Sequence, residues 1–212
     1  MLWSMVIPLK PLALAKSRLA DTAGDGLRPG LALAFAQDTV AAALACPAVR
    51  DVVVVTDDVL AARELAALGA RIVPDEPRSG LNAALAHAAA VVRGERPDGA
   101  LAALNADLPA LRPRELTRVL EAAAQFPRSF LPDAAAIGTT LLAVARGREL
   151  LPAFGTDSRA RHRASQAVEL GLDAVDSVRQ DVDTGEDLRA ALTLGVGPRT
   201  AAAAARLLIP GQ

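Results

Sequence analysis

The chain has 212 residues, a length that fits one large domain or two small ones. Hydrophobic residues make up 52% of it and aromatic residues only 2%, with no Tyr. The chain therefore has few aromatic side chains that could stack on nucleic-acid bases. The net charge of −1 lacks the basic excess that binders of nucleic acid and of acidic membranes carry. We therefore expect neither nucleic acid nor a membrane as a partner.

The first residues and the cysteine count indicate a soluble protein of the cytoplasm. Lys10 and Pro11 interrupt the first apolar run, which is too short for a signal peptide or a membrane span. The lone Cys46 cannot form an internal disulfide, which is typical of a reducing compartment. With no His or second Cys near it in the sequence, we interpret it as an inert thiol.

Strand-like and helix-like segments alternate along the first half of the chain. The continuous β-branched run at 51–56 is typical of a strand in the middle of a parallel sheet. Pro113 fits the first turn of a helix, and Gly69 fits the end of another. The expected strands are 3–9, 51–56, 71–73 and 100–105. The expected helices are 27–45, a segment from an Asp57 or Asp58 cap to about 68, 81–93, and 113 to about 125.

The second half of the chain is less regular. Segments 129–131 and 139–144 fit a mixed or antiparallel extension of the sheet, while 158–170, the end of 183–194, and 198–208 fit helices. Strands that alternate with helices imply right-handed βαβ units. We expect a single α/β domain over 1–212, with a mostly parallel central sheet and helices on both faces.

Ligands of open α/β sheets bind beyond the carboxyl ends of the strands, so polar residues are expected there. Each predicted strand is followed by such residues. In chain order they are Lys10, Lys16 and Arg18, then Asp57 and Asp58, then Asn82, and finally Asp107.

The basic loop after the first strand can hold a triphosphate through Lys10, Lys16 and Arg18. It lacks the glycines and the Gly-Lys-Ser/Thr ending of a P-loop, so an ATPase of that class is excluded. A solvated loop is the alternative interpretation.

Carboxylates form the second group of candidates. Asp107 directly follows a central strand, where its oxygens can bind Mg²⁺, although an N-cap for the next helix is an alternative. Asp181 and Asp183 point the same way in an extended segment, and Asp183 or Thr184 could instead cap a helix. Together the three aspartates would supply a magnesium site.

A second anion site is indicated by small and hydroxylated residues near two later turns. Gly138-Thr139-Thr140 and the segment 154–162 offer N–H and hydroxyl donors, with Arg159 and Arg161 adding charge. Ser158 could equally be only an N-cap. Asn82 can read a base edge or a ribose, or cap a helix. The two histidines, His87 and His162, show no metal-ligand spacing, and we expect a structural or surface role for His87.

These segments together resemble the guanylyltransferase family that acts on 2-phospho-L-lactate or phosphoenolpyruvate in the biosynthesis of coenzyme F-420, in its actinobacterial form. The resemblance covers nearly the whole chain. The stretches that carry it are 6–10, 15–19, 80–82, 106–111, 138–140, 154–155, 158–162, 181–184 and 194–198.

The resemblance implies a nucleotidyltransferase fold of the Rossmann-like kind and assigns roles to particular residues. Asp107, Asp181 and Asp183 would bind Mg²⁺. Lys10, Lys16, Gly80, Asn82 and Asp107 would contact GTP, and Thr140, Gly155 and Ser158 would hold a small phosphorylated carboxylic acid. Lys16, Arg18 and Asp107 would act in the transfer of GMP.

The resemblance to actinobacterial members favours phosphoenolpyruvate as the acceptor, while 2-phospho-L-lactate and 3-phosphoglycerate stay open. Other interpretations also remain: a nucleotidyltransferase for a sugar phosphate or a molybdopterin, a glycosyltransferase that uses Asp181 and Asp183, or a non-catalytic GTP-binding subunit. The sequence leaves the oligomeric state open, as it does a transient hand-off of the product to the downstream transferase.

Overall fold

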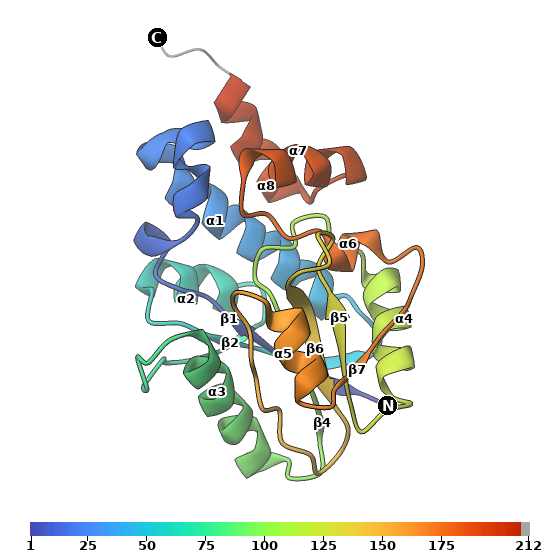
Figure 1. Cartoon of the computed structure of the whole chain (residues 1–212). Helices are drawn as coiled ribbons and strands as arrows, with labels where there is room; N and C mark the ends of the chain where they lie inside the picture. The colour runs from blue at the N-terminus through green and yellow to red at the C-terminus, as the bar shows by residue number, and fades with distance from the viewer. Residues whose placement is uncertain (209–212) are drawn as a thin grey trace.

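The computed structural model describes the backbone of residues 1–208 and their side chains, except those of 20–23, 25 and 208. Within that part the chain forms a seven-stranded sheet of order β3-β2-β1-β4-β6-β5-β7 (Figure 1). Its strands are β1 (Trp3–Pro8), β2 (Val49–Val55), β3 (Arg71–Val73), β4 (Ala100–Leu104), β5 (Arg128–Pro132), β6 (Thr139–Val144) and β7 (Val168–Glu169).

The first four strands pair in parallel, as the alternation of strands and helices predicts. β6 then runs antiparallel to β4 and to β5, which confirms the expected extension after residue 129. The order of the sheet reverses between β1 and β4, because the chain runs outward to β3 before it crosses back. In open α/β sheets such a reversal leaves a crevice at the carboxyl ends of the strands.

Helices cover both faces of the sheet, as expected. They are α1 (Ala20–Leu44), α2 (Val59–Ala66), α3 (Leu81–Glu95), α4 (Pro113–Ala123), α5 (Ser158–Ala164), α6 (Asp176–Arg179), α7 (Gly185–Leu194) and α8 (Pro198–Ala205), with short 3-10 turns at Leu12–Leu14, Ser17–Leu19 and Arg206–Leu208. One core packs α1, α4 and α6 against one face of the sheet. A second core packs α3 against the other face, where α5 also lies (Figure 1).

Local sequence explains most of the boundaries. Asp58 caps α2 by accepting a hydrogen bond from the Ala61 N–H, and Pro113 stands in the first turn of α4. A capping box of Thr184 and Asp187 starts α7. α1 begins at Ala20, before the predicted residue 27, and the non-helical backbone of Gly24 puts a kink near its start.

One predicted helix is wrong. The segment 158–170 was expected to be helical throughout, but α5 ends at Ala164 and residues Val168–Glu169 form the edge strand β7 beside β5. Gln166 takes a left-handed backbone with φ of 64°, which stops the helix. Glycine is the usual residue in that conformation, so the helix end was not visible in the sequence.

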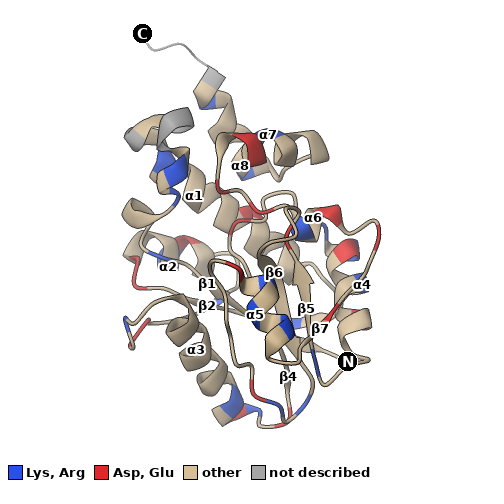
Figure 2. Ribbon diagram, viewed as in Figure 1, with Lys and Arg blue, Asp and Glu red and all other residues tan. Residues whose placement is uncertain are grey.

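Charged residues of both signs alternate over the helices and loops in Figure 2, in line with a net charge of −1. Among the described residues, none of the helices combines the length and the apolar character needed to cross a membrane.

Candidate active site

A cavity of about 610 Å³ opens at the carboxyl ends of β1 and β4, where the topology places a crevice. It is bordered by the loop after β1, the turn after β4, the start of β6, the loop before α5 and the segment before α7. Its lining includes Lys10, Lys16, Arg18, Asn105, Asp107, Asp133, Gly138, Thr139, Gly155, Thr156, Ser158, Asp181 and Asp183.

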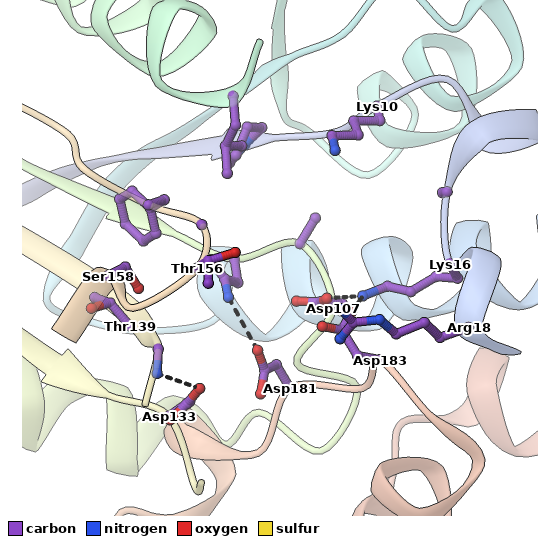
Figure 3. Close-up of a pocket in the computed structure, with 18 of the residues that line it drawn as sticks. Lys10, Lys16, Arg18, Asp107, Asp133, Thr139, Thr156, Ser158, Asp181 and Asp183 are labelled. Atoms are coloured by element: carbon purple, nitrogen blue, oxygen red, sulfur yellow. Dashed lines mark hydrogen bonds and ion pairs between the residues drawn. The ribbon is translucent and has the colours of Figure 1, made fainter. Parts of the chain in front are cut away.

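The loop after β1 brings the predicted cations into this cavity. Leu12 and Leu19 are buried and anchor the loop at both ends, and the Leu12 N–H donates to Asp58 Oδ2 over 2.8 Å. Between these anchors Lys16 has a left-handed backbone, with φ of 58°. Such a conformation is costly for a residue with a Cβ and is kept where the surroundings require it. Here it directs the lysine side chain toward Asp107 (Figure 3).

Lys16 joins two of the predicted carboxylates. Its Nζ forms an ion pair with Asp107 and another with Asp183 Oδ1 at 2.8 Å. The side chains of Lys16 and Asp107 are only 13% and 17% exposed, so these charges interact with little screening. Burial alone would lower the pKa of Lys16, but the two aspartates outweigh it and raise that pKa. Asp183 shows the converse: burial would raise its pKa, and Lys16 with Arg18 and Lys10 lowers it.

In Figure 3, Asp181 lies between the side of the cavity with Lys16 and Asp107 and the side with Thr139 and Ser158. Its pKa is shifted in the opposite direction to that of Asp183. Burial, followed by the negative charges of Asp107, Asp183 and Asp133, raises its pKa to about 8. Its Oδ2 accepts a long hydrogen bond, 3.4 Å, from the Asn105 amide. Burial and the neighbouring carboxylates both disfavour the ionised form of Asp181, and a bound cation would favour it.

The three aspartates line the same cavity, as the sequence predicts, but they do not form a ready-made cage. Among the described residues no group of three or more His, Cys, Asp or Glu side chains is placed to hold a metal ion together. The Lys16 ammonium stands between Asp107 and Asp183 instead.

The opposite wall carries hydroxyl groups. Gly155 and Ser158 line it as predicted, and Thr139 and Thr156 join them (Figure 3). Thr140 does not reach the cavity, since its side chain is fully buried and its hydroxyl has no hydrogen-bond partner among the described residues. Successive residues of a strand face opposite sides of the sheet, so Thr139 and Thr140 cannot both line this wall through their side chains.

The loop before β6 is held by Asp133, a residue that the sequence did not single out. Its carboxylate accepts hydrogen bonds from the N–H groups of Ile137, at 2.9 Å, and Gly138, at 2.8 Å. A side chain at position 138 would overlap this carboxylate, so only glycine fits. Asp133 stands in no recognisable pattern, and only the folded sheet brings it to the site. Asn105 lies two residues before Asp107 in the same motif, but the motif gives it no role.

Gly80 and Asn82, predicted to contact the nucleotide, do not line the cavity. The Asn82 amide donates to the Phe154 carbonyl at 3.0 Å and accepts from the Phe154 N–H at 2.8 Å. Arg161 donates to the same carbonyl at 3.0 Å. Asn82 therefore ties α3 to the loop that carries Gly155, while Gly80, with φ of 95°, begins α3.

The sheet and its helices form a nucleotidyltransferase-like α/β fold, which two solved structures share. A nucleotidyl transferase from Methanothermobacter matches with a TM-score of 0.63 at 22% identity, covering 91% of this chain and 97% of that one. A 4-diphosphocytidyl-2C-methyl-D-erythritol synthase matches with a TM-score of 0.59 at 13% identity, covering 91% and 98%. At these identities the likeness establishes the fold.

Sequence comparisons identify the family to which the chain belongs. Residues 3–206 match the family model described as "Guanylyl transferase CofC like". The phosphoenolpyruvate guanylyltransferase of Streptomyces avermitilis is 84% identical, covering 100% of this chain and 98% of that protein. Proteins of the same name from Streptomyces coelicolor and Thermomonospora curvata are 79% and 63% identical, covering 100% and 97% of this chain and 100% and 90% of theirs. The chain belongs to the CofC-like guanylyl transferase family.

Proposed function

We propose that the protein transfers GMP from GTP to the phosphate of phosphoenolpyruvate and releases pyrophosphate, as a step in the biosynthesis of the deazaflavin coenzyme F-420. The family of guanylyl transferases and relatives named for phosphoenolpyruvate support this proposal. The observation that carries it is the two-walled cavity. Cations and carboxylates on one wall suit a nucleoside triphosphate, while hydroxyls on the other suit a small acid.

The proposed transfer needs little acid–base catalysis from the protein. An oxygen of the acceptor phosphate attacks the α-phosphorus of GTP, a new P–O bond forms, and the bond to the bridging oxygen of the β-phosphate breaks. The electron pair of that bond leaves with pyrophosphate. Because the nucleophile is already an anion at neutral pH, no general base is needed, and the residues that line the described cavity include neither His nor Cys.

GTP and the acceptor acid are both polyanions, so they repel each other in the site. The cations of the loop after β1 reduce this repulsion. Lys10, Lys16 and Arg18 all line the cavity. The raised pKa of Lys16 keeps its ammonium charged at every physiological pH. Preorganised positive charge of this kind stabilises the transition state of a phosphoryl or nucleotidyl transfer.

Asp107, Asp181 and Asp183 are the residues that would hold Mg²⁺. The buried Oδ1 of Asp107 has no hydrogen-bond partner among the described residues, and burial together with the neighbouring carboxylates raises the pKa of Asp181, so the donor set fits a hard cation. Magnesium usually takes one or two carboxylates together with substrate phosphates, which agrees with aspartates that do not form a complete cage. When bound, the ion would neutralise charge on the phosphates.

We place this reaction in the cytoplasm, which the buried, unpaired Cys46 supports. A transient hand-off of the product to the next transferase of the pathway is part of the proposal.

The test is the release of pyrophosphate by the purified protein with Mg²⁺ and GTP. Phosphoenolpyruvate, 2-phospho-L-lactate and 3-phosphoglycerate are supplied in turn, with ATP in place of GTP as a control. Release is expected with GTP and phosphoenolpyruvate, and its loss is expected in Asp107→Ala. The downstream transferase is added in parallel, since it consumes the product. Silence with every acid, even with that enzyme present, would contradict the proposal.

A further inference from the structure

His162 is a buried side chain that the proposed transfer leaves without a role. It lies in α5, is 0% exposed, and does not line the cavity. The rings of Phe130 and Phe154 lie beside it, with ring centroids 5.5 Å and 5.2 Å from its own. Both ring nitrogens nevertheless have polar partners.

These partners determine where the imidazole carries its proton. The Ala153 N–H donates to Nε2 over 3.1 Å, and a backbone N–H can only donate. Nε2 must therefore present its lone pair. A neutral imidazole has one N–H, which is then on Nδ1, and Nδ1 lies 2.9 Å from the Thr139 hydroxyl oxygen. Burial, with the positive charges of Arg128 and Arg161, lowers the pKa of His162 to about 4, so the ring is neutral at physiological pH.

The proton on Nδ1 determines how the hydroxyl of Thr139, which lines the cavity, forms hydrogen bonds. Its oxygen accepts a hydrogen bond from His162 Nδ1–H, and its own proton has no acceptor among the described side chains and main-chain groups. A hydroxyl can normally act as donor or acceptor. Here the histidine donates to the oxygen, so the hydroxyl is left to act as a donor, and Thr139 lies at the cavity beside Ser158 (Figure 3).

We propose that His162 is a positioning residue that fixes the Thr139 hydroxyl as a hydrogen-bond donor to a carboxylate oxygen of the acceptor. The inference rests on the proposed function for the nature of that acceptor. Its phosphate must reach the nucleotide beside Lys16, and Thr139 lies on the opposite wall, so the carboxylate end of the acid is the part that meets Thr139. A fixed donor favours an anionic oxygen and disfavours a group that can only donate.

Two substitutions of His162 separate this role from simple packing. In His162→Asn the side-chain amide occupies the place of Nδ1 and can still donate to Thr139. In His162→Gln the amide occupies the place of Nε2, so it keeps the contact with Ala153 and loses Thr139. We expect His162→Gln to raise KM for phosphoenolpyruvate about 10-fold or more, since the Thr139 hydroxyl is no longer fixed as a donor to a charged group. KM for GTP should stay within about twofold, and His162→Asn should stay near the wild type for both substrates.

A double-mutant comparison adds a second measurement. Thr139→Val removes the hydroxyl and should raise KM for the acceptor as His162→Gln does, whereas Thr139→Ser should retain most of the affinity. The combined Thr139→Val and His162→Gln variant should be no worse than either alone, because both remove one interaction. Equal losses in His162→Asn and His162→Gln, or additive losses in the combined variant, would overturn the proposal.

The tautomer is tested without any activity. The chain has two histidines, His87 and His162, so protein labelled with ¹⁵N at histidine gives two ring systems in a long-range ¹H–¹⁵N spectrum. The ring absent from the spectrum of His162→Asn should show a proton on Nδ1 and a bare Nε2 at pH 7. A proton on Nε2 would refute the positioning role of His162 even in an active enzyme. If the protein has the expected tautomer but releases no pyrophosphate with any acid, the proposed function is refuted and the hydrogen bond from His162 to Thr139 is not.

Discussion

Lowering the pH from 7 to 5 is expected to destabilise the fold through His162. This ring is fully buried, and its pKa falls from 6.5 to about 4 in the folded protein. Between these two values the unfolded chain binds a proton at His162 that the folded chain does not. The stabilisation is therefore complete above pH 6.5 and is lost as the pH falls toward 4. The two pKa values predict a loss of about 2 kcal/mol between pH 7 and pH 5.

The measurement is urea unfolding at pH 7 and pH 5 for the wild type, His162→Asn and His87→Asn. Carboxylates also contribute to the pH dependence, but they are common to all three proteins and cancel in the comparison. The wild type and His87→Asn should lose about 2 kcal/mol more than His162→Asn over this interval. If the three proteins lost the same stability, His162 would not be held neutral by burial, and the reasoning about its environment would fail.

Three substitutions test other parts of the site. Gly138→Ala places a methyl group against the Asp133 carboxylate, which holds the loop before β6. It should lower the free energy of unfolding, or weaken binding of the acceptor, by roughly 1–3 kcal/mol, as measured by urea unfolding and by KM. Gly171→Ala, where the added methyl meets nothing within 4 Å, is its control. Lys16→Met should reduce kcat/KM for GTP by about 100-fold or more, whereas normal kinetics would remove the lysine from the mechanism. Asn82→Ala should raise KM for the acceptor because it frees the loop at Phe154; a rise confined to GTP would support a direct nucleotide contact instead.

Much of the fold could be predicted because its signals are local. The valine run of β2, the cap at Asp58 and Pro113 at the start of α4 are each visible within a few residues. The left-handed turn at Gln166 and the short strand β7 after it could not be predicted, because glutamine rarely adopts that conformation and two residues carry no periodicity. These features depend on tertiary packing rather than on propensity.

The candidate site was predictable where residues follow strands and unpredictable where contacts cross the chain. Lys16 and Asp183 are 167 positions apart, and no local pattern indicates that they pair. The strand period allows either Thr139 or Thr140 to face the cavity, and only the position of α5 decides in favour of Thr139. The polar side chain of Asn82 suggested a ligand contact, yet its partners are backbone groups of a loop that lies far along the sequence.

The transfer of GMP is tested most directly by following the label from GTP labelled at the α- or the γ-phosphorus. The purified protein is incubated with Mg²⁺ and phosphoenolpyruvate, and the labelled compounds are separated. The account predicts that the α-label appears in a new compound that joins GMP to the phosphate of the acid, while the γ-label appears only in pyrophosphate. Transfer of the γ-label to the acid, or an α-label found only in GTP, GDP or GMP, would contradict it.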